Sequence, residues 1–206
     1  MKPGFSENLA FGQVGESAIA RWCKSRGHCV LPVYEKEIDS GKGPRLFAPS
    51  GQIVAPDMMV IPQFGDVVWI EAKHKTVFSW HRISRRWVTG IDLHHYQQYQ
   101  EVEHRSARRV WMFFLHRSDT PAEIDISHGC PPQCPVGLFV QSLRRLMLSE
   151  NHRSQRHGRS GMVYWAVESL KLQATLDEVE SLTRTPLEGC LRDHPHRGDP
   201  RAGPHD

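Results

Sequence analysis

Charged side chains interrupt two apolar runs between residues 55 and 75, which read APDMMVIPQFGDVVWIEAKHK. Asp57 lies inside the first run, and Glu71 and Lys73 lie at the end of the second. Burying an unpaired charge is costly, so buried strands rarely carry one without a use for it. We therefore look first for chemistry that needs two carboxylates and an ammonium on neighbouring strands.

The two runs are expected to form a hairpin, with strands at about 53–61 and 67–73. Side chains alternate along a strand, and a three-residue loop ending at Gly65 would place Asp57 directly opposite Glu71. The last position of such a loop needs a left-handed backbone, which glycine supplies. Turn chemistry and charge placement thus predict the same register.

Two carboxylates this close are typical ligands of a hard divalent cation, Mg²⁺ above all, with Mn²⁺ as a substitute. Such a metal would acidify a water molecule and stabilise charge on phosphoryl oxygens. Lys73 shares a face with Glu71, so it could orient the attacking water, help deprotonate it or neutralise growing charge. The alternative is a structural salt bridge, which desolvation makes a poor source of stability.

The elements that must position these residues follow from the patterning. Residues 15–26 carry apolar side chains at helical spacing, and Gly27 is a candidate C-cap. A strand containing Pro32 comes next, then a loop rich in Gly and Pro, and then the hairpin. A second helix begins after the N-cap Asp92, and RRVWMFFLH reads as a central strand. The order is helix, three strands, helix, strand.

The rest of the chain is less regular. We predict a fold of the α/β (α+β) class, with a mixed central sheet flanked by helices and a C-terminal extension. Residues 1–12 are expected to be a flexible N-terminus, 13–117 the core, and 118–189 additions packed on the core. Residues 190–206 have the composition of a disordered tail.

Composition excludes several classes of protein. A chain of 206 residues is long enough for one domain with a real core, and its net charge of +3 is a weak argument for nucleic acid. The sequence has neither a run of apolar residues long enough to span a membrane nor the apolar core of a signal peptide. Five irregularly spaced cysteines do not resemble a secreted disulfide framework, so we expect a cytoplasmic chain.

Pro56-Asp57, followed by Glu71-Ala72-Lys73, resembles the PD-(D/E)XK motif of the restriction-endonuclease-like nuclease superfamily. The segment GQVGESAIARWCKSRGHCVL is similar to the first helix and strand of its Holliday-junction-resolvase-like members. The resemblance covers about residues 12–117 and implies the core order αβββαβ. The roles it implies are metal ligation by Asp57, Glu71 and the backbone carbonyl of Ala72, catalysis by Asp57, Glu71 and Lys73, and auxiliary ligation by Glu16.

The second helix departs from the pattern of many exonuclease members, which carry a Gln and a Tyr four residues apart. HHYQQYQEV has no Gln followed by a Tyr four residues later, although Tyr96 and Gln100 give the reverse order, and Gln97 or Gln100 is the candidate to face the site instead. His94 and His95, at the start of this helix, either approach a phosphate or are surface histidines.

A basic and aromatic segment follows the second hairpin strand. Mixed basic and aromatic side chains suit phosphate contacts and base stacking, and the alternative is a solvated loop with its aromatics in the core. We predict DNA contacts from Lys75, Arg82, Arg85 and Arg86, interleaved with His81, Phe78, Trp80 and Trp87. Further along, Cys130 and Cys134 with His128 are either part of a zinc site or ordinary loop residues.

The expected function is that of a metal-dependent nuclease hydrolysing phosphodiester bonds in DNA. The alternative is a non-catalytic or partner-dependent nucleic-acid-binding protein that retains the nuclease fold. DNA is the expected partner, and the sequence leaves open a homodimer and a protein partner that supplies specificity.

Overall fold

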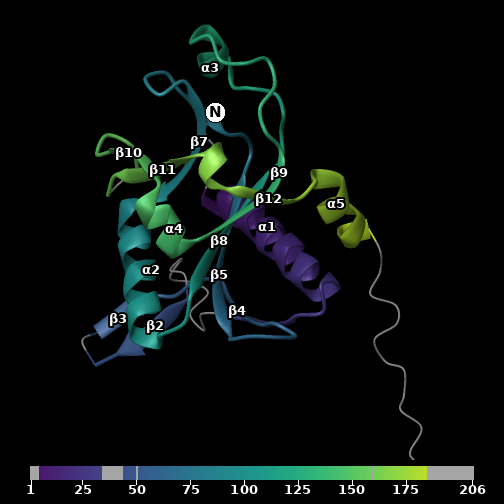
Figure 1. Cartoon of the computed structure of the whole chain (residues 1–206), viewed down its shortest axis with the longest axis vertical. Helices are drawn as coiled ribbons and strands as arrows, with labels where there is room; N and C mark the ends of the chain where they lie inside the picture. Colours follow the sequence, from purple (N-terminus) through teal and green to yellow (C-terminus); the bar gives the residue numbers. More distant parts are fainter. Residues whose placement is uncertain (1–4, 34–43, 50, 159, 185–206) are drawn as a thin grey trace, which may run out of the picture.

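The computed structural model describes residues 5–33, 44–49, 51–158 and 160–184 (Figure 1). The tail predicted to be disordered, 190–206, lies outside the described residues. Among the described residues, no helix combines the length and the apolar character that crossing a membrane requires.

A mixed central sheet forms the middle of the molecule. Strands β5 and β8 are parallel, whereas the other neighbouring strands are antiparallel. Its six strands lie in the order β1 (Cys29–Pro32), β4 (Met58–Ile61), β5 (Val68–Lys75), β8 (Val110–His116), β9 (Gly137–Ser142) and β12 (Lys171–Ala174). The predicted class, with its αβββαβ order and a central RRVWMFFLH strand, is confirmed.

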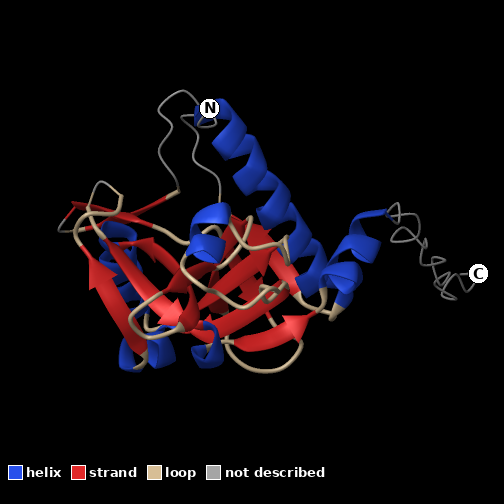
Figure 2. Ribbon diagram, turned by 90° about the horizontal axis from the view of Figure 1, so that it is seen from above, coloured by secondary structure: helices blue, strands red, loops and turns tan. Residues whose placement is uncertain are grey.

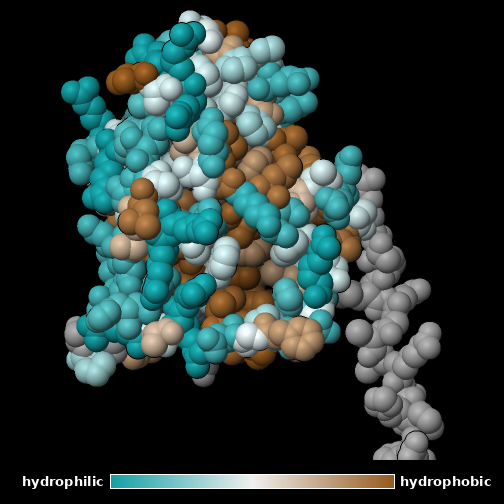
Figure 3. Space-filling view, viewed as in Figure 1, coloured by the Kyte–Doolittle hydropathy of each residue, from teal (hydrophilic) through white to brown (hydrophobic). Residues whose placement is uncertain are grey.

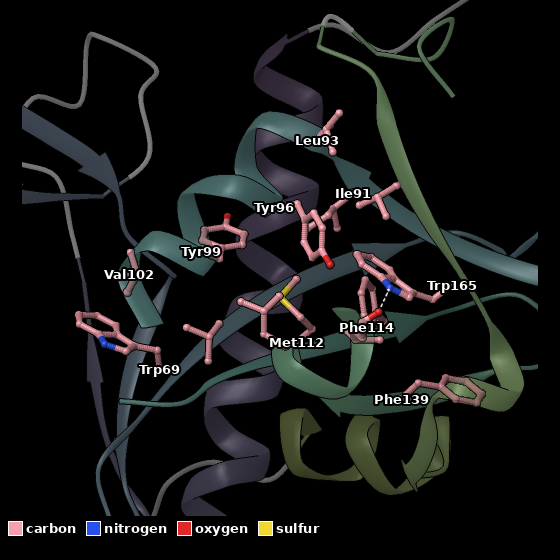
Figure 4. Close-up of a cluster of buried hydrophobic side chains, with 14 of the residues drawn as sticks. Trp69, Ile91, Leu93, Tyr96, Tyr99, Val102, Met112, Phe114, Phe139 and Trp165 are labelled. Carbon is pink, nitrogen blue, oxygen red and sulfur yellow. Dashed lines mark hydrogen bonds between the residues drawn. The ribbon is translucent and has the colours of Figure 1, made fainter. Parts of the chain in front are cut away.

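Each face of this sheet is covered by a helix. Helix α1 (Phe5–Ser25) packs Ala18 and Ile19 against Ile70 and Phe113 in one buried cluster. Helix α2 (Leu93–Ser106) packs its buried side chains against the other face, in the cluster drawn in Figure 4. Because side chains alternate along β5, Glu71 lies on the α2 side and Ala72 on the α1 side.

A second, four-stranded sheet lies in the order β10 (Glu150–Ser154), β11 (Met162–Ala166), β7 (Arg86–Asp92) and β6 (Ser79–His81). A hairpin of β2 (Arg45–Ala48) and β3 (Gly51–Val54) lies beside α2 (Figure 1). The remaining described helices are α3 (Glu123–Ser127), α4 (Leu143–Leu148), the 3₁₀ turn η2 (Val167–Ser169) and α5 (Leu176–Arg184). Figure 2 shows the strands gathered in the body of the molecule and the long helix α1 rising from it.

Helix α1 begins at Phe5, so the predicted flexible N-terminus is wrong for residues 5–12. Phe11 stacks on the imidazole of His74, with 3.7 Å between ring centroids, which holds this first part of the helix on β5. Gly15 is needed here for packing, because a Cβ atom on it would lie 2.4 Å from the Cβ of His74. Glycine inside a helix weakens it, which is why the sequence alone did not extend the helix this far.

The predicted hairpin register is confirmed, because Met58 pairs with Ile70 and Val60 with Val68. The loop is longer than three residues, since the strands stop at Ile61 and resume at Val68, and Pro62 has no N–H to donate to the ladder. Gly65 has a positive φ of 99°, as predicted.

The first hairpin strand was predicted to run without a break over 53–61, and that is wrong. It is divided into β3 and β4 because the backbone between them bonds elsewhere. The Ala55 N–H donates to the Pro44 carbonyl, and the Asp57 carbonyl accepts from the Val33 N–H. Asp57 therefore lies in a short irregular segment just before β4.

The C-terminal additions do more than pack on the core. Strands β9 and β12 extend the central sheet, and β10 and β11 complete the second sheet with β6 and β7. In the second helix, the predicted N-cap is confirmed, because an Asp92 carboxylate oxygen accepts from the His94 N–H.

Candidate active site

The predicted motif residues meet beside the middle of the central sheet. Asp57 precedes β4, and Glu71, Ala72 and Lys73 follow one another along β5. The Ala72 N–H donates to Asp57 Oδ2 over 2.8 Å, so a side chain takes up a strand N–H at this point. This hydrogen bond fixes the Asp57 carboxylate next to Glu71.

Glu71 is almost fully buried, with 1% of its side chain exposed, and its two carboxylate oxygens differ. Oε1 forms an ion pair with the ammonium of Lys73. Oε2 is buried without a hydrogen-bond partner among the described residues. An unsatisfied buried carboxylate oxygen is costly, and such an atom in a native protein calls for an explanation such as a bound ion.

Burial raises the pKa of Asp57 well above its ordinary value, and the charge of Glu71 raises that pKa further, whereas Lys73 opposes the rise. Burial and then Glu71 also raise the pKa of Glu16, on α1. Carboxylates whose pKa burial and mutual repulsion raise are typical of functional sites, and a cation would relieve the repulsion.

Lys73 stays protonated. Burial by itself would lower the pKa of its ammonium, but the charges of Glu71 and then Asp57 outweigh burial and raise that pKa above its ordinary value. The Lys73 side chain is 25% exposed, so the ammonium also lies at the surface of the site.

Two residues of α2 lie beside this cluster. His95 was expected either to approach a phosphate or to be a surface histidine, and Tyr99 was not predicted to join the site. Tyr99 is buried; burial raises the pKa of its hydroxyl, and Glu71, with which that hydroxyl interacts, raises it further. His95 lies four residues earlier on the same helix face; burial lowers its pKa, and Lys73 lowers it further. The signal that could have found them is their spacing of four residues from each other on a helix whose N-cap, Asp92, was predicted.

The glutamines proposed for that place lie elsewhere. Gln97 is exposed, and Gln100 interacts with the hydroxyl of Tyr96 rather than with the carboxylates. Gln98 accepts a hydrogen bond of 3.1 Å from the Val54 N–H, which ties β3 to α2. His94 is exposed at the start of the helix.

The basic segment divides into two parts. Lys75 is half-buried on β5, and burial, followed by the charge of Lys73, lowers its pKa to about 8. Arg82, Arg85 and Arg86 are exposed at the turn between β6 and β7, and none of them forms an ion pair with a described residue.

For the aromatic residues of the same segment, the structure favours the alternative of packing into the core. Phe78 and Trp87 are buried, and the half-buried Trp80 packs edge-on against Trp87, with 5.2 Å between ring centroids. Their alternation along β6 and β7 directs them into the core shared by the two sheets. The bases of a nucleic acid cannot reach Phe78 or Trp87.

Cys130 and Cys134 lie in the loop between α3 and β9. Cys134 is buried, and its thiol approaches the Phe78 carbonyl at 3.9 Å. In the described part of the chain, no three His, Cys, Asp or Glu side chains are grouped closely enough to hold a metal ion on their own. This finding covers the cysteine loop and the carboxylate cluster alike.

The carboxylates fit an ion that needs few protein ligands. Mg²⁺ is usually held by one or two carboxylates, with water and substrate phosphate completing its shell. Asp57 and the unpartnered Oε2 of Glu71 match that donor set. Glu16 is near enough for its charge to raise the pKa of Asp57 further, beyond burial and Glu71. Among the described residues, however, it does not complete a closed metal site with Asp57 and Glu71.

No protein-family model matches this chain, and no curated protein matches it at a significant level. Solved structures that are similar to it include the following two. One is Hjc, a Holliday junction resolvase from the archaeal hyperthermophile Archaeoglobus fulgidus, at 8% identity and a TM-score of 0.42, covering 77% of this chain and 90% of that chain. The other is D212, a nuclease from a fusselovirus, at 12% identity and a TM-score of 0.37, covering 89% and 95%. With both TM-scores below 0.5, we base the function on the site itself.

Proposed function

We propose that this chain is a metal-dependent nuclease that hydrolyses phosphodiester bonds in DNA, with Mg²⁺, or Mn²⁺ in its place, as cofactor. The observation that carries the proposal is the Glu71 carboxylate. It is buried opposite Asp57, with one oxygen paired to Lys73 and the other without a hydrogen-bond partner in the described part of the chain. A purely structural ion pair would leave no such oxygen unused.

The residues that would hold the cation are Asp57 and Glu71, with the Ala72 carbonyl and Glu16 as auxiliary ligands. When bound, the cation would supply Lewis acidity at the phosphoryl group and an acidified water. Glu16, on α1, would act through charge or an intervening water, since the three carboxylates do not form a closed cage among the described residues.

Lys73 would orient the attacking water and stabilise the negative charge that grows on the phosphoryl oxygens. The raised pKa of its ammonium favours these roles over proton abstraction. Ion pairing with Glu71 holds the ammonium at the site before substrate binds.

Two residues of α2 would position the charged groups. The Tyr99 hydroxyl, whose pKa burial and then the charge of Glu71 raise, would help to orient that carboxylate. The lowered pKa of His95 leaves its imidazole neutral at neutral pH, so it adds no second positive charge beside Lys73.

A nucleic-acid-binding protein that retains the fold without cutting is the second candidate. The exposed arginines of the β6–β7 turn favour it, because they could bind phosphates whether or not the carboxylates act. The charge cluster argues for the enzyme, since binding alone does not require buried carboxylates.

The test is a cleavage assay on labelled linear duplex, single strand, flap, four-way junction and supercoiled plasmid, with Mg²⁺, Mn²⁺ or EDTA. We expect cutting only with metal, and a loss of at least about 10²–10³-fold in Asp57→Asn and Lys73→Met, because each removes charge from the reacting centre. Lys24→Met, at an exposed lysine of α1, is the matched control and should cut normally.

A folded wild-type protein that binds these DNAs but cuts none of them with either metal would overturn the nuclease. If both site variants still cut DNA, the active site must lie elsewhere in the chain. Equal loss in the Lys24→Met control would mean that the site variants act through a general effect of charge or folding.

A further inference from the structure

The outer face of the second sheet carries aromatic rings that the proposed active site does not use. Side chains on directly paired residues share a face of a sheet. Trp87, Val163 and Trp165 point inward and are buried in the core. On the other face, Tyr164 pairs with Gly90 on one side and with His152 on the other.

Three rings from three strands lie parallel on this outer face. His81 stacks on His152 with 3.8 Å between centroids and planes 9° apart. His152 stacks on Tyr164 with 4.5 Å between centroids and planes 5° apart. Gly90 leaves room for the Tyr164 ring, because a Cβ atom on it would lie 2.6 Å from Tyr164 Cδ1. We call His81, His152 and Tyr164 the ring column; all three are half-buried, and His152 is stacked between the other two.

Arginines that form no ion pair with a described residue border the ring column. Arg86 is the cross-strand partner of His81, and Arg82 and Arg85 lie in the same β6–β7 turn. Ser84, in that turn, contacts Asn151 of β10 over 3.4 Å, which holds the turn beside the column. In Figure 3 the surface over β10 and β11 is mostly hydrophilic, as expected for a face that binds a charged partner rather than an apolar one.

The column is continuous with the proposed active site. His157 Nδ1 lies 2.7 Å from the Tyr164 hydroxyl. Three residues on, the Ser160 hydroxyl hydrogen-bonds Asp92, the N-cap of α2, and accepts from the His94 N–H over 3.0 Å. His95, the next residue of α2, faces Lys73. One surface therefore runs from the arginine turn over the rings to the helix end that borders the carboxylates.

We propose that the ring column and the arginines of the β6–β7 turn bind an unpaired, single-stranded segment of the DNA substrate. Bases stack on the end rings of the column, His81 and Tyr164, while the arginines contact phosphates. Ring faces favour single strands over duplex, because a base in a duplex is already stacked on both sides. The inference rests on the proposed function and adds to it a substrate class: DNA with a single-stranded part next to the bond that is cut.

The test is binding in EDTA, so that no cutting occurs, to a single-stranded oligonucleotide, a blunt duplex of the same sequence and a duplex with a single-stranded overhang. We expect the first and third to bind at least about tenfold more tightly than the blunt duplex. Arg82→Ala/Arg85→Ala/Arg86→Ala should weaken single-strand binding and reduce the salt slope by about 2, near 0.7 for each lost phosphate contact. The charge-matched control is Lys24→Ala/Arg109→Ala/Arg145→Ala, at exposed positions, which should bind normally.

Stacking is read separately with 2-aminopurine in the single strand, whose fluorescence is quenched when it stacks. His81→Ala should lose the quenching and about fivefold or more in affinity, whereas His81→Phe keeps a ring and should retain both. Melting temperatures of the two variants show whether the loss comes from unfolding, and an unfolded His81→Ala leaves the decision to His152→Ala against His152→Phe.

Equal binding of blunt duplex and single strand, or equal loss in the charge-matched control, would overturn the inference. Quenching that persists in the folded alanine variants would overturn it as well. These results leave the nuclease intact if metal-dependent cutting is seen. Conversely, preferential single-strand binding without any cutting would overturn the nuclease and retain this surface.

Discussion

At the scale of single residues, the site concentrates negative charge that the protein itself does not neutralise. Asp57, Glu71 and Glu16 repel one another, and the ammonium of Lys73 is ion-paired to only one of them. Such an arrangement costs stability in the free protein, which is the usual compromise between stability and activity at a functional site. It also means that stability can report on metal binding.

We expect Asp57→Asn to raise the free energy of unfolding in EDTA by about 1–2 kcal/mol, because it removes a buried like charge. The Asn side-chain oxygen can still accept from the Ala72 N–H. Mg²⁺ should raise the melting temperature of the wild type but not of this variant. Asp66→Asn, with a carboxylate that is 88% exposed, is the control and should change neither quantity. A destabilised Asp57→Asn, or one still stabilised by Mg²⁺, would contradict the repulsion and the metal site respectively.

At the scale of elements, the contact between α1 and β5 decides where Glu16 lies. Gly15 brings the helix against His74, whose Nδ1 approaches the Phe11 carbonyl at 2.5 Å. On the other side of the ring, His74 Nε2 accepts from Arg117, which in turn binds Glu180 of α5 over 2.6 Å. One imidazole thus joins the first helix, the catalytic strand and the last described helix.

Gly15→Ala should destabilise the protein by about 1–3 kcal/mol and weaken metal-dependent cutting, because the added methyl pushes α1, and with it Glu16, away from β5. Gly12→Ala is the matched control on the same helix. Its Cβ atom would have Glu16 Oε1, at 3.9 Å, as its nearest neighbour. It should gain up to about 1 kcal/mol from helix propensity. Urea unfolding measures both, and equal effects in the two variants would show that the close approach is unimportant.

At the scale of the whole molecule, the two sheets share one core. The cluster in Figure 4 combines Phe114 and Phe139 of the central sheet with Trp165 of the second sheet, whose indole N–H donates to the Leu146 carbonyl over 2.9 Å. His116, at the end of β8, is fully buried at the junction between the sheets, with its ring stacked on Phe78 at 3.6 Å.

Burial, and then the charge of Lys75, lower the pKa of His116 to about 3, from an ordinary value of 6.5. Between these two values the unfolded chain carries the proton and the folded chain does not. This residue therefore lowers stability as the pH falls, by up to about 1.4 kcal/mol for each pH unit. His116→Phe keeps the stack on Phe78 and removes the titration.

We expect the wild type to lose about 2 kcal/mol more than His116→Phe between about pH 7 and about pH 5, as measured by urea unfolding at each pH. The carboxylates of the active site are present in both proteins, so their contribution cancels in the comparison. Equal losses in the two proteins would mean that His116 takes up its proton in the folded state.

The sequence by itself determined the parts of the site whose signals are local. Alternation along the strands and the need for a left-handed backbone at Gly65 predicted the register that places Asp57 opposite Glu71, and the structure has that register. The αβββαβ order followed from runs of apolar residues within single elements. Local turn chemistry and local periodicity are enough for these features, because each depends on residues that are neighbours in the chain.

Only the tertiary structure decided which distant segments meet. Strand β7 pairs with β11 about seventy residues later, and this pairing buries Trp87 and leaves His81 on the outer face. His95 and Tyr99 lie near Glu71 and Lys73 because α2 crosses the sheet beside that part of β5. The apolar pattern of the helix does not specify where the helix crosses the sheet. In the sequence, Gly15 indicates only a weak helix former. The structure shows that it is needed for the close packing of α1 on His74. Contacts between segments far apart in the chain depend on the packing of the whole molecule. They produce no periodic pattern of residues in the sequence of either segment.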